Sequence, residues 1–382
     1  MAHINKILIV CGEVSGDLHA AHLVRHLKTL RPGLQVSAVG GAHLAQEGAE
    51  IFFPIRELSV IGLFDVIRKL PRFFSLKKTI LQKLGSQHYD GLILVDFSGF
   101  NLRLARAVNR RLPVIYYVSP QVWASRTGRV KTIKEYVSKM CVLFKFEADF
   151  YKKHGVHAEF FGHPLLDIVK PTMKKEEFLN NVKLPLSGMT LALLPGSRRA
   201  EVERILPVML AAAELLKEHF PVQAVIAKSE AVEWEIYKAL TKKCAAETRI
   251  IEGKTYDCLG AADFAMVASG TATLETAIMG TPFVLLYKMG LLNYLLYRPQ
   301  VKVPCIGMVN IAAGKKIVPE FVQFGAEPRR IAREIAGILQ DAKALARMKE
   351  DLKGLKETLG EKGAGFRAAE SILRDLESRL PS

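Results

Sequence analysis

An alternation between short apolar runs and helical stretches occurs twice along the 382 residues, and it limits the fold more than any other feature. In the first half, segments 17–30 and 102–111 carry helical periodicity between apolar runs that are too short for buried helices. Such an alternation predicts βαβ units, which form a parallel sheet covered by helices on both faces. The runs expected to be buried parallel strands are 7–10, 35–39, 91–95 and 114–118.

The alternation begins again after a stretch between residues 167 and 187 that contains proline and lysine, which we interpret as an interdomain connection. Helices are expected at 199–219 and 271–279, and the charged segment 328–380 is expected to be helical. The strands expected in this half are 191–194, 223–227, 249–252, 264–267 and 282–286. The sequence therefore predicts an α/β fold of two Rossmann-like domains with a helical C-terminal tail. The expected domain limits are 1–167, 185–350 and 351–382.

Charge and cysteine usage restrict the partners and the compartment. The formal net charge is +16, which favours an anionic partner such as nucleic acid, an acidic membrane or a phosphorylated substrate. The five cysteines are scattered without a CxxC pair, which favours reduced thiols in the cytosol over disulfides or a structural zinc site. No apolar run reaches the roughly 18 to 20 residues of a membrane span, and no secretory signal pattern is visible. We therefore expect a cytoplasmic or peripheral protein.

The strongest local signal for ligand binding is the segment LALLPGSRRAEVERILP at 191–207. Gly196 permits a tight turn after the strand, and Ser197 is a good N-cap for the helix that follows. A helix N-terminus offers free N–H groups to a diphosphate, and Arg198 adds a permanent cation. The alternative is a capped turn with a surface arginine.

A second strand-to-helix turn, ASGTATLE at 268–275, has the same character. Ser269, Gly270 and Thr271 again offer backbone N–H groups to an anion. Glu275 lies one turn into the helix, where its carboxylate could accept both hydroxyls of a ribose; the alternative is a glutamate that stabilises the helix dipole.

In the first half, the loop CGEVSGD at 11–17 joins the first strand to a helix and lacks the GxGxxG fingerprint, so an NAD dehydrogenase is disfavoured. The loop places two carboxylates near the sheet, although Asp17 could be an N-cap. The loop residues that could contact an acceptor are Glu13, Ser15, Gly16 and Asp17.

Asp96 ends an apolar strand and begins DFSGFN, so it is expected at the carboxyl edge of the sheet, where α/β proteins bind ligands. A partly desolvated carboxylate there has a raised pKa and can act as a base, whereas the alternative is a loop or capping aspartate. His19, His22 and His26 share helical spacing but no carboxylate completes a metal set, so we interpret them as a helix flank. Without an Asp-x-Asp pair, a reaction without metal or other cofactor is favoured.

The segment 61–84 determines how the positive charge is used, because basic residues alternate there with large apolar ones. This pattern suits a segment lying on anionic lipid; the alternative is a pair of core helices with solvated lysines. Pro71 is expected to divide the segment into a helix–turn–helix hairpin. A second apolar stretch, 290–298, could lie on the membrane or form a subunit contact. The residues expected to contact the membrane are Leu63, Phe64, Ile67, Arg68, Lys69, Leu70, Arg72, Phe73 and Phe74.

Taken together, these motifs resemble those of the lipid-A-disaccharide synthases, inverting glycosyltransferases of the GT-B fold. The resemblance spans most of the chain, in the expected order. The motifs that carry it are CGEVSGD, VDFSGFN, YYVSPQVWASR, FFGHPLLD, LLPGSRRAEVE, ASGTATLE and PCIGMVN.

The resemblance implies a donor, UDP-2,3-diacylglucosamine, and an acceptor, 2,3-diacylglucosamine 1-phosphate, joined by a β(1→6) linkage with release of UDP. It implies that Gly196, Ser197 and Arg198 bind the diphosphate, with Arg198 stabilising the leaving group. It places around the nucleotide Ser269, Gly270, Thr271, Glu275 and Asn310.

The resemblance also assigns the base to Asp96. Related sequences often carry a second acid in the following loop, where this chain has Ser98 and Gly99, so Glu13 and Asp17 are the reserve candidates. A homodimer, and a location on the cytoplasmic face of the inner membrane, are implied as well.

Other UDP-sugar transferases of the GT-B fold and UDP-sugar epimerases would share the nucleotide half but would not need the apolar segment 61–84. A nucleic-acid-binding protein is compatible with the charge but lacks a recognisable recognition module, so no nucleic acid is expected as a partner.

Overall fold

The computed structural model describes residues 3–58, 63–242, 244, 246–297 and 304–380, and only the backbone at 63–70, 293, 296 and 297. The chain forms two compact units. Unit 1 comprises Met1–Pro164 together with Leu359–Ser382, and unit 2 comprises Leu165–Thr358. The chain therefore passes from one unit to the other twice.

Unit 1 is built on a seven-stranded parallel sheet with strand order β3-β2-β1-β4-β5-β6-β7. Its strands are β1 (Lys6–Val10), β2 (Gln35–Gly40), β3 (Glu50–Pro54), β4 (Gly91–Val95), β5 (Val114–Tyr117), β6 (Lys139–Val142) and β7 (Ala158–Phe160). Its helices are α1 (Val14–Leu30), α2 (Ala42–Gln46), α3 (Leu63–Ser86), α4 (Ser98–Val108), α5 (Val122–Ser125), α6 (Val130–Tyr136), α7 (Lys145–Lys153) and α18 (Ala364–Glu377).

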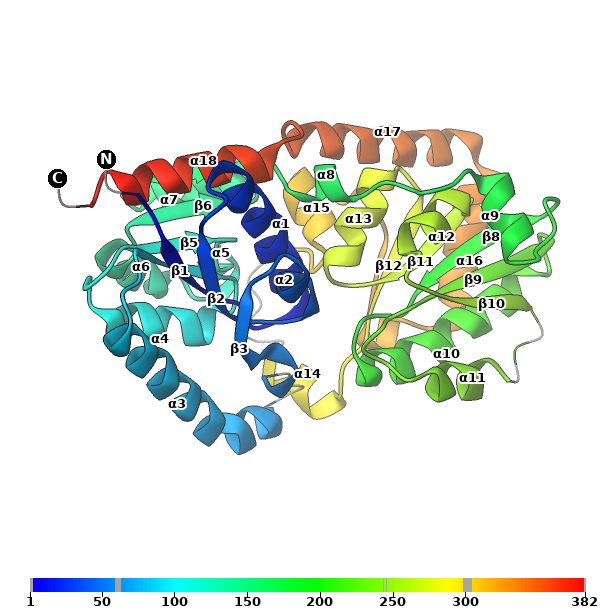
Figure 1. Ribbon diagram of the computed structural model, residues 1–382. Helices are drawn as coiled ribbons and strands as arrows, with labels where there is room; N and C mark the ends of the chain where they lie inside the picture. The colour runs from blue at the N-terminus through cyan, green and yellow to red at the C-terminus, as the bar shows by residue number, and fades with distance from the viewer. Residues whose placement is uncertain (1–2, 59–62, 243, 245, 298–303, 381–382) are drawn as a thin grey trace. The chain divides into compact units, whose positions relative to one another are not determined.

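The two faces of this sheet bury separate apolar clusters, because successive side chains of a strand point to opposite faces. Ile7 and Ile9 of β1 pack with α1 and α18, which lie side by side (Figure 1). Leu8 and Val10 belong to the cluster formed with α3, α4 and α6. The C-terminal helix α18 is thus part of the core of unit 1.

Unit 2 repeats the topology with six parallel strands in the order β10-β9-β8-β11-β12-β13. Its strands are β8 (Met189–Leu194), β9 (Val222–Lys228), β10 (Glu247–Glu252), β11 (Phe264–Ala268), β12 (Phe283–Tyr287) and β13 (Glu320–Val322). Its helices are α8 (Leu165–Ile168), α9 (Lys175–Asn181), α10 (Arg199–Leu216), α11 (Trp234–Thr241), α12 (Thr255–Ala261), α13 (Thr271–Met279), α14 (Leu291–Tyr297), α15 (Met308–Ala313), α16 (Pro328–Gln340) and α17 (Ala342–Thr358). The predicted α/β architecture of two Rossmann-like sheets with helices at the C-terminus is confirmed.

The stretch expected to be an interdomain connection contains α9 and is tied into unit 2. The Asp257 carboxylate accepts hydrogen bonds from the backbone N–H groups of Thr172, at 2.6 Å, and Met173, at 3.1 Å. Its other oxygen accepts the Thr172 hydroxyl at 2.8 Å. A carboxylate 85 residues further along the chain therefore orders this stretch.

The helical hairpin expected at 61–84 is wrong, because α3 continues through Pro71 as one helix. Proline removes one N–H and costs roughly 3 kcal/mol inside a helix. The C-terminal turns of α3 offset this cost, since Leu76 and Ile80 are fully buried against the sheet. Among the helices that the structure describes, none is both long enough and apolar enough to cross a membrane.

Candidate active site

The predicted site loops of each unit follow adjacent central strands, at the point where the strand order reverses. In unit 1, β1 pairs with β4, and Val10 lies opposite Leu94. In unit 2, β8 pairs with β11, and Leu194 lies opposite Val267. Ligands of open α/β sheets bind at the carboxyl ends of the strands at such switch points. The structure therefore brings Asp96 beside the 11–17 loop, and Gly196–Arg198 beside Ser269–Thr271.

The backbone around Asp96 is strained. Asp96 and Phe97 adopt φ angles of +46° and +48°, and Val118, at the end of the neighbouring strand, adopts +64°. Left-handed conformations of residues other than glycine cost about 1–3 kcal/mol each and occur often at functional sites. The Asp96 N–H donates to the Val118 carbonyl at 3.2 Å, while the Asp96 carbonyl accepts Asn101 Nδ2 at 2.9 Å and the Tyr116 hydroxyl. These hydrogen bonds hold the Asp96 backbone in its left-handed conformation despite the energetic cost.

The environment of Asp96 raises the pKa of its carboxyl to about 7, chiefly through burial and then through the charge of Glu13. Glu147 raises this pKa further, whereas a hydrogen bond from the Phe97 N–H opposes the shift. At neutral pH such a carboxyl is about half ionised and can both accept and release a proton, which suits a general base.

The segment 11–17 divides into structural and accessible residues, and its last four residues are not a loop but the first turn of α1, which begins at Val14. Asp17 is buried, and its carboxylate accepts the N–H groups of Gly41, at 2.6 Å, and His43, at 3.0 Å. Asp17 therefore holds the turn between β2 and α2 and is not the N-cap. Gly16 is also buried, whereas Ser15 is half-buried and Glu13 is exposed.

Close packing explains one glycine of this loop. A Cβ atom on Gly12 would lie 2.2 Å from Cγ of the Phe97 ring. The ring of the residue after Asp96 therefore rests on the backbone of the first loop, and this contact couples the two loops.

Sequence reasoning missed Glu147, which explains the SPQVW motif. This buried carboxylate accepts Ser119 Oγ at 2.8 Å and Trp123 Nε1 at 3.0 Å. It also accepts the N–H groups of Leu143 and Phe144, at 3.1 and 3.2 Å, at the start of α7. Glu147 thus anchors the segment after β5, whose Val118 carbonyl holds Asp96. No local pattern indicates this role, because a first-turn glutamate is common in helices.

In unit 2, the loop after β8 already binds a carboxylate of the protein, that of Glu201. The Glu201 carboxylate accepts the N–H groups of Ser197, at 3.1 Å, and Arg198, at 3.3 Å. It also pairs with Arg198 Nη1 at 3.3 Å. Gly196 adopts φ +116°, and a Cβ there would lie 2.6 Å from Glu201 Oε2. The loop geometry therefore suits an oxyanion.

The loop after β11 exposes backbone at its turn. Gly270 adopts φ +150°, a conformation that L side chains rarely adopt, and α13 begins at Thr271 without a side chain capping it. Ser269 is fixed by its N–H bond to the Leu286 carbonyl, at 2.9 Å. The free N–H groups that begin α13 remain available to an anion.

Glu275 has a partner that sequence reasoning missed. The hydroxyl of Tyr256, in the first turn of α12, donates to Glu275 Oε1 at 2.9 Å. Burial raises the pKa of Glu275, and this bond opposes the rise. Tyr256 therefore orients one carboxylate oxygen and stabilises its ionised form.

Asn310 is buried, and its side chain is engaged within unit 2. Its Oδ1 accepts the N–H groups of Ile317 and Val318 at 2.8 and 3.0 Å. Its Nδ2 donates to the Val318 carbonyl, at 2.9 Å, and to Glu320 Oε1, at 2.8 Å. These bonds give Asn310 a role in shaping the PCIGMVN segment, and the nucleotide contact expected of it stays a prediction.

The described part of α3 has an apolar face toward the sheet and one exposed aromatic side chain on its outer side. Phe73 is partly buried and packs against the core, with its ring centroid 5.9 Å from that of Phe97 and 6.3 Å from that of Phe100. Phe74 is 67% exposed, and Arg72 is exposed as well. The side chains of the remaining expected contacts lie outside the described residues: Leu63, Phe64, Ile67, Arg68, Lys69 and Leu70.

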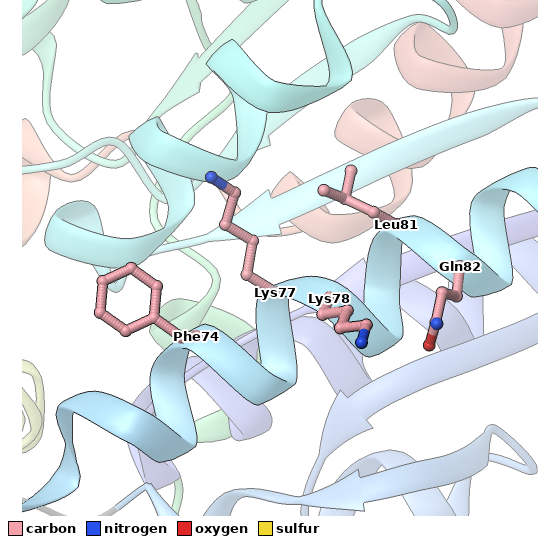
Figure 2. Close-up of a pocket in the computed structure, with 5 residues that line it drawn as sticks. All are labelled: Phe74, Lys77, Lys78, Leu81 and Gln82. Carbon is pink, nitrogen blue, oxygen red and sulfur yellow. The ribbon is translucent and has the colours of Figure 1, made fainter.

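A shallow hollow on α3 combines apolar and basic side chains. Figure 2 shows Phe74 about one turn before the adjacent Lys77 and Lys78, and Leu81 and Gln82 complete the lining on the following turn. This mixture is typical of surfaces that contact anionic lipid. On unit 2, helix α14 presents a second apolar surface, because Leu291, Leu292 and Leu295 are more than half exposed.

Comparison with known proteins agrees with this geometry. The chain matches the family described as lipid-A-disaccharide synthetase over residues 7–372. It is 42% identical over 366 residues to the lipid-A-disaccharide synthase of Syntrophus aciditrophicus (strain SB), covering 95% of this chain and 96% of that protein.

Solved structures share the fold at low sequence identity. A putative UDP-N-acetylglucosamine 2-epimerase from Listeria monocytogenes has a TM-score of 0.66 at 13% identity, covering 100% of this chain and 99% of its own. The calicheamicin glycosyltransferase CalG4 has a TM-score of 0.62 at 14% identity, covering 100% of both chains. The GT-B architecture is thus confirmed, and the chain belongs to the lipid-A-disaccharide synthetase family.

Proposed function

We propose that this enzyme transfers the diacylglucosamine of UDP-2,3-diacylglucosamine to 2,3-diacylglucosamine 1-phosphate, forming a β(1→6) disaccharide 1-phosphate and UDP. The observation that carries the proposal is Asp96, an acid with a pKa near 7 at the switch point of unit 1. Family membership supplies the substrates, and the acid supplies the chemistry that the transfer requires.

In the proposed reaction, Asp96 accepts the proton of the acceptor hydroxyl as its oxygen attacks the anomeric carbon of the donor. The new C–O bond forms on the face opposite the departing UDP, so the configuration inverts. The bond between the anomeric carbon and the diphosphate oxygen breaks, and negative charge grows on UDP. Asp96 is suited to this step because its pKa lies near the operating pH.

Unit 2 is proposed to hold UDP. Gly196, Ser197 and Arg198 would bind the diphosphate, with the α13 N-terminus at Ser269–Thr271 beside them. Arg198 and the two helix N-termini would stabilise charge on the leaving group in place of a metal ion. Glu201 would have to release the N–H groups that it now holds. Glu275 would accept the ribose hydroxyls.

We further propose that α3 rests on the cytoplasmic face of the inner membrane, because both substrates carry acyl chains. The exposed Phe74 and the neighbouring Lys77 and Lys78 would contact anionic lipid. Co-sedimentation with vesicles containing phosphatidylglycerol should weaken in Phe74→Ser, with an unchanged melting temperature. Phe73→Ser is the matched control, because Phe73 packs against the core beside Phe97 and Phe100 and its loss should lower the melting temperature.

The reaction itself is tested by incubating the purified enzyme with the two diacylated sugars and identifying the product by mass spectrometry and proton NMR. A disaccharide 1-phosphate mass together with a β anomeric coupling constant supports the proposal. Absence of disaccharide would contradict it, and epimerisation of UDP-N-acetylglucosamine by the same preparation would favour an epimerase instead.

A further inference from the structure

Three arginines lie near the Asp96 loop of unit 1, and none of them forms an ion pair with a carboxylate among the described residues. Arg103 lies on α4, Arg126 follows α5, and Arg129 ends the short 3-10 helix Thr127–Arg129. Burial lowers the pKa of Arg129, and the nearby positive charges of Arg126 and Arg103 lower it further. Arg126 and Arg129 belong to one short segment, whereas Arg103 comes from α4, so the fold brings Arg103 to the other two.

The cluster is anchored near Asp96 by a direct bond. Arg129 Nη1 donates to Ser98 Oγ at 3.0 Å, and Ser98 is two residues beyond Asp96, at the first position of α4. The Tyr116 hydroxyl donates to the Asp96 carbonyl, and the charges of both Asp96 and Arg129 act on Tyr116. Arg129 therefore lies on the same side of the sheet edge as Asp96.

Several other arginines in the described ranges have an acidic partner. Arg25 pairs with Glu47, for example, and Arg379 with Asp375. Within the described ranges, no ion pair involves Arg103, Arg126 or Arg129. Three guanidinium groups repel one another, and this repulsion is relieved when an anion binds among them.

We propose that Arg103, Arg126 and Arg129 bind the phosphomonoester of the acceptor sugar, an inference that rests on the proposed function. Guanidinium groups match phosphate oxygens bidentately, and a phosphomonoester carries nearly two negative charges at neutral pH. The Ser98 hydroxyl and the N-terminus of α4 add further donors. A phosphate held there would orient the sugar ring whose hydroxyl Asp96 deprotonates.

The site is tested by comparing two acceptors, 2,3-diacylglucosamine 1-phosphate and the same sugar without its phosphate. Arg129→Gln should lower kcat/KM for the phosphorylated acceptor about 10- to 100-fold, the usual effect of losing a charge-assisted hydrogen bond. It should leave the slower reaction of the phosphate-free acceptor unchanged. Arg103→Gln, at an exposed position that does not threaten folding, should show the same selectivity with a smaller loss.

Arg106→Gln is the matched control, because Arg106 is exposed on the same helix but its charge is not among those that act on Arg129. It should change neither reaction. An equal loss with both acceptors in Arg129→Gln, or equal use of both acceptors by the wild type, would overturn the phosphate site while leaving the transferase reaction intact. Failure of the wild type to form disaccharide from either acceptor would instead contradict the proposed function.

A second readout distinguishes the acceptor phosphate from the phosphates of membrane lipids. Binding of Arg129→Gln to phosphatidylglycerol vesicles should equal that of the wild type. A parallel loss of vesicle binding and of turnover on both acceptors would assign the arginines to the lipid surface and overturn the proposal.

Discussion

The two units share one topology and place opposite chemistry at the same point of it. In unit 1, the carboxyl edge of the central strands carries an acid, Asp96, whose pKa is raised by burial. In unit 2, the equivalent edge carries backbone N–H groups and Arg198, which already hold the carboxylate of Glu201. The topology therefore determines where ligands bind, and the loop residues determine which charge each edge accepts.

The backbone conformations at the carboxyl edges of the two sheets also differ between the units. At the edge of unit 1, Asp96, Phe97 and Val118 adopt positive φ angles, and their side chains are kept despite the strain. At the equivalent edge of unit 2, Gly196 and Gly270 adopt such angles without a Cβ clash. Unit 1 thus presents a side chain, whereas unit 2 presents bare backbone to an anion.

The largest effect should come from removing the acid of unit 1. Asp96→Asn should lower kcat by about 10³- to 10⁴-fold, since general base catalysis contributes on this order. The dissociation constant of UDP, measured by calorimetry, should change less than about twofold, because no part of the nucleotide site is altered. Retention of most activity would remove Asp96 from the mechanism.

The matching change in unit 2 should affect both kcat and the affinity for UDP. Arg198→Gln should lower kcat about 10²- to 10³-fold, as expected for losing stabilisation of a leaving group. UDP should also bind more weakly, unlike in Asp96→Asn, and isothermal titration of the two variants measures this contrast. Unchanged UDP affinity in Arg198→Gln would show that the two edges are not specialised as described.

The pH dependence of kcat/KM should report on Asp96, and thus on unit 1 alone. Because the pKa of Asp96 is raised to about 7, the ionised base is lost as the pH falls below that value. The rate kcat/KM should therefore fall about tenfold per pH unit, or about 100-fold at pH 5. UDP affinity should not follow this profile. A rate that stays constant between pH 5 and pH 8 would contradict the role of burial at Asp96.

The smallest effect should come from the tyrosine that supports Glu275. Tyr256→Phe removes the hydroxyl that donates to Glu275 Oε1 at 2.9 Å, so UDP should bind about 3- to 10-fold more weakly. Binding of 2′-deoxy-UDP should be affected less, because it lacks one of the hydroxyls that Glu275 would accept. Equal weakening for both nucleotides would limit Tyr256 to a structural role.

The sequence indicated the central strands and the loops after them, because apolar runs such as Gly91–Val95 and Phe264–Ala268 are fully buried. It did not reveal β3, β6, β7 and β13. The residues of β3 and β7 are at most partly buried, so their hydrophobic pattern is weak, and β6 and β13 are only 4 and 3 residues long. The sequence also did not show that α3 continues through Pro71, because this depends on tertiary packing and not on local helix propensity.

The supporting residues of the site were hidden for a related reason. Glu147 and Ser119 are 28 residues apart, and Tyr256 and Glu275 are 19 residues apart, so only the fold brings each pair together. Asp17 and Asn310 carried strong motif signals, yet their polar atoms serve the backbone of neighbouring turns. Motifs located the site loops, whereas hydrogen-bond partners separated ligand-facing residues from supporting ones.

Hydrogen–deuterium exchange with and without UDP tests the division of roles most directly. UDP should slow exchange of the N–H groups at 197–201 and 270–275 in unit 2. The acceptor sugar phosphate, added alone, should instead slow exchange at 96–103 and 126–129 in unit 1. Protection of the Asp96 loop by UDP, with the 197–201 segment unchanged, would contradict the account.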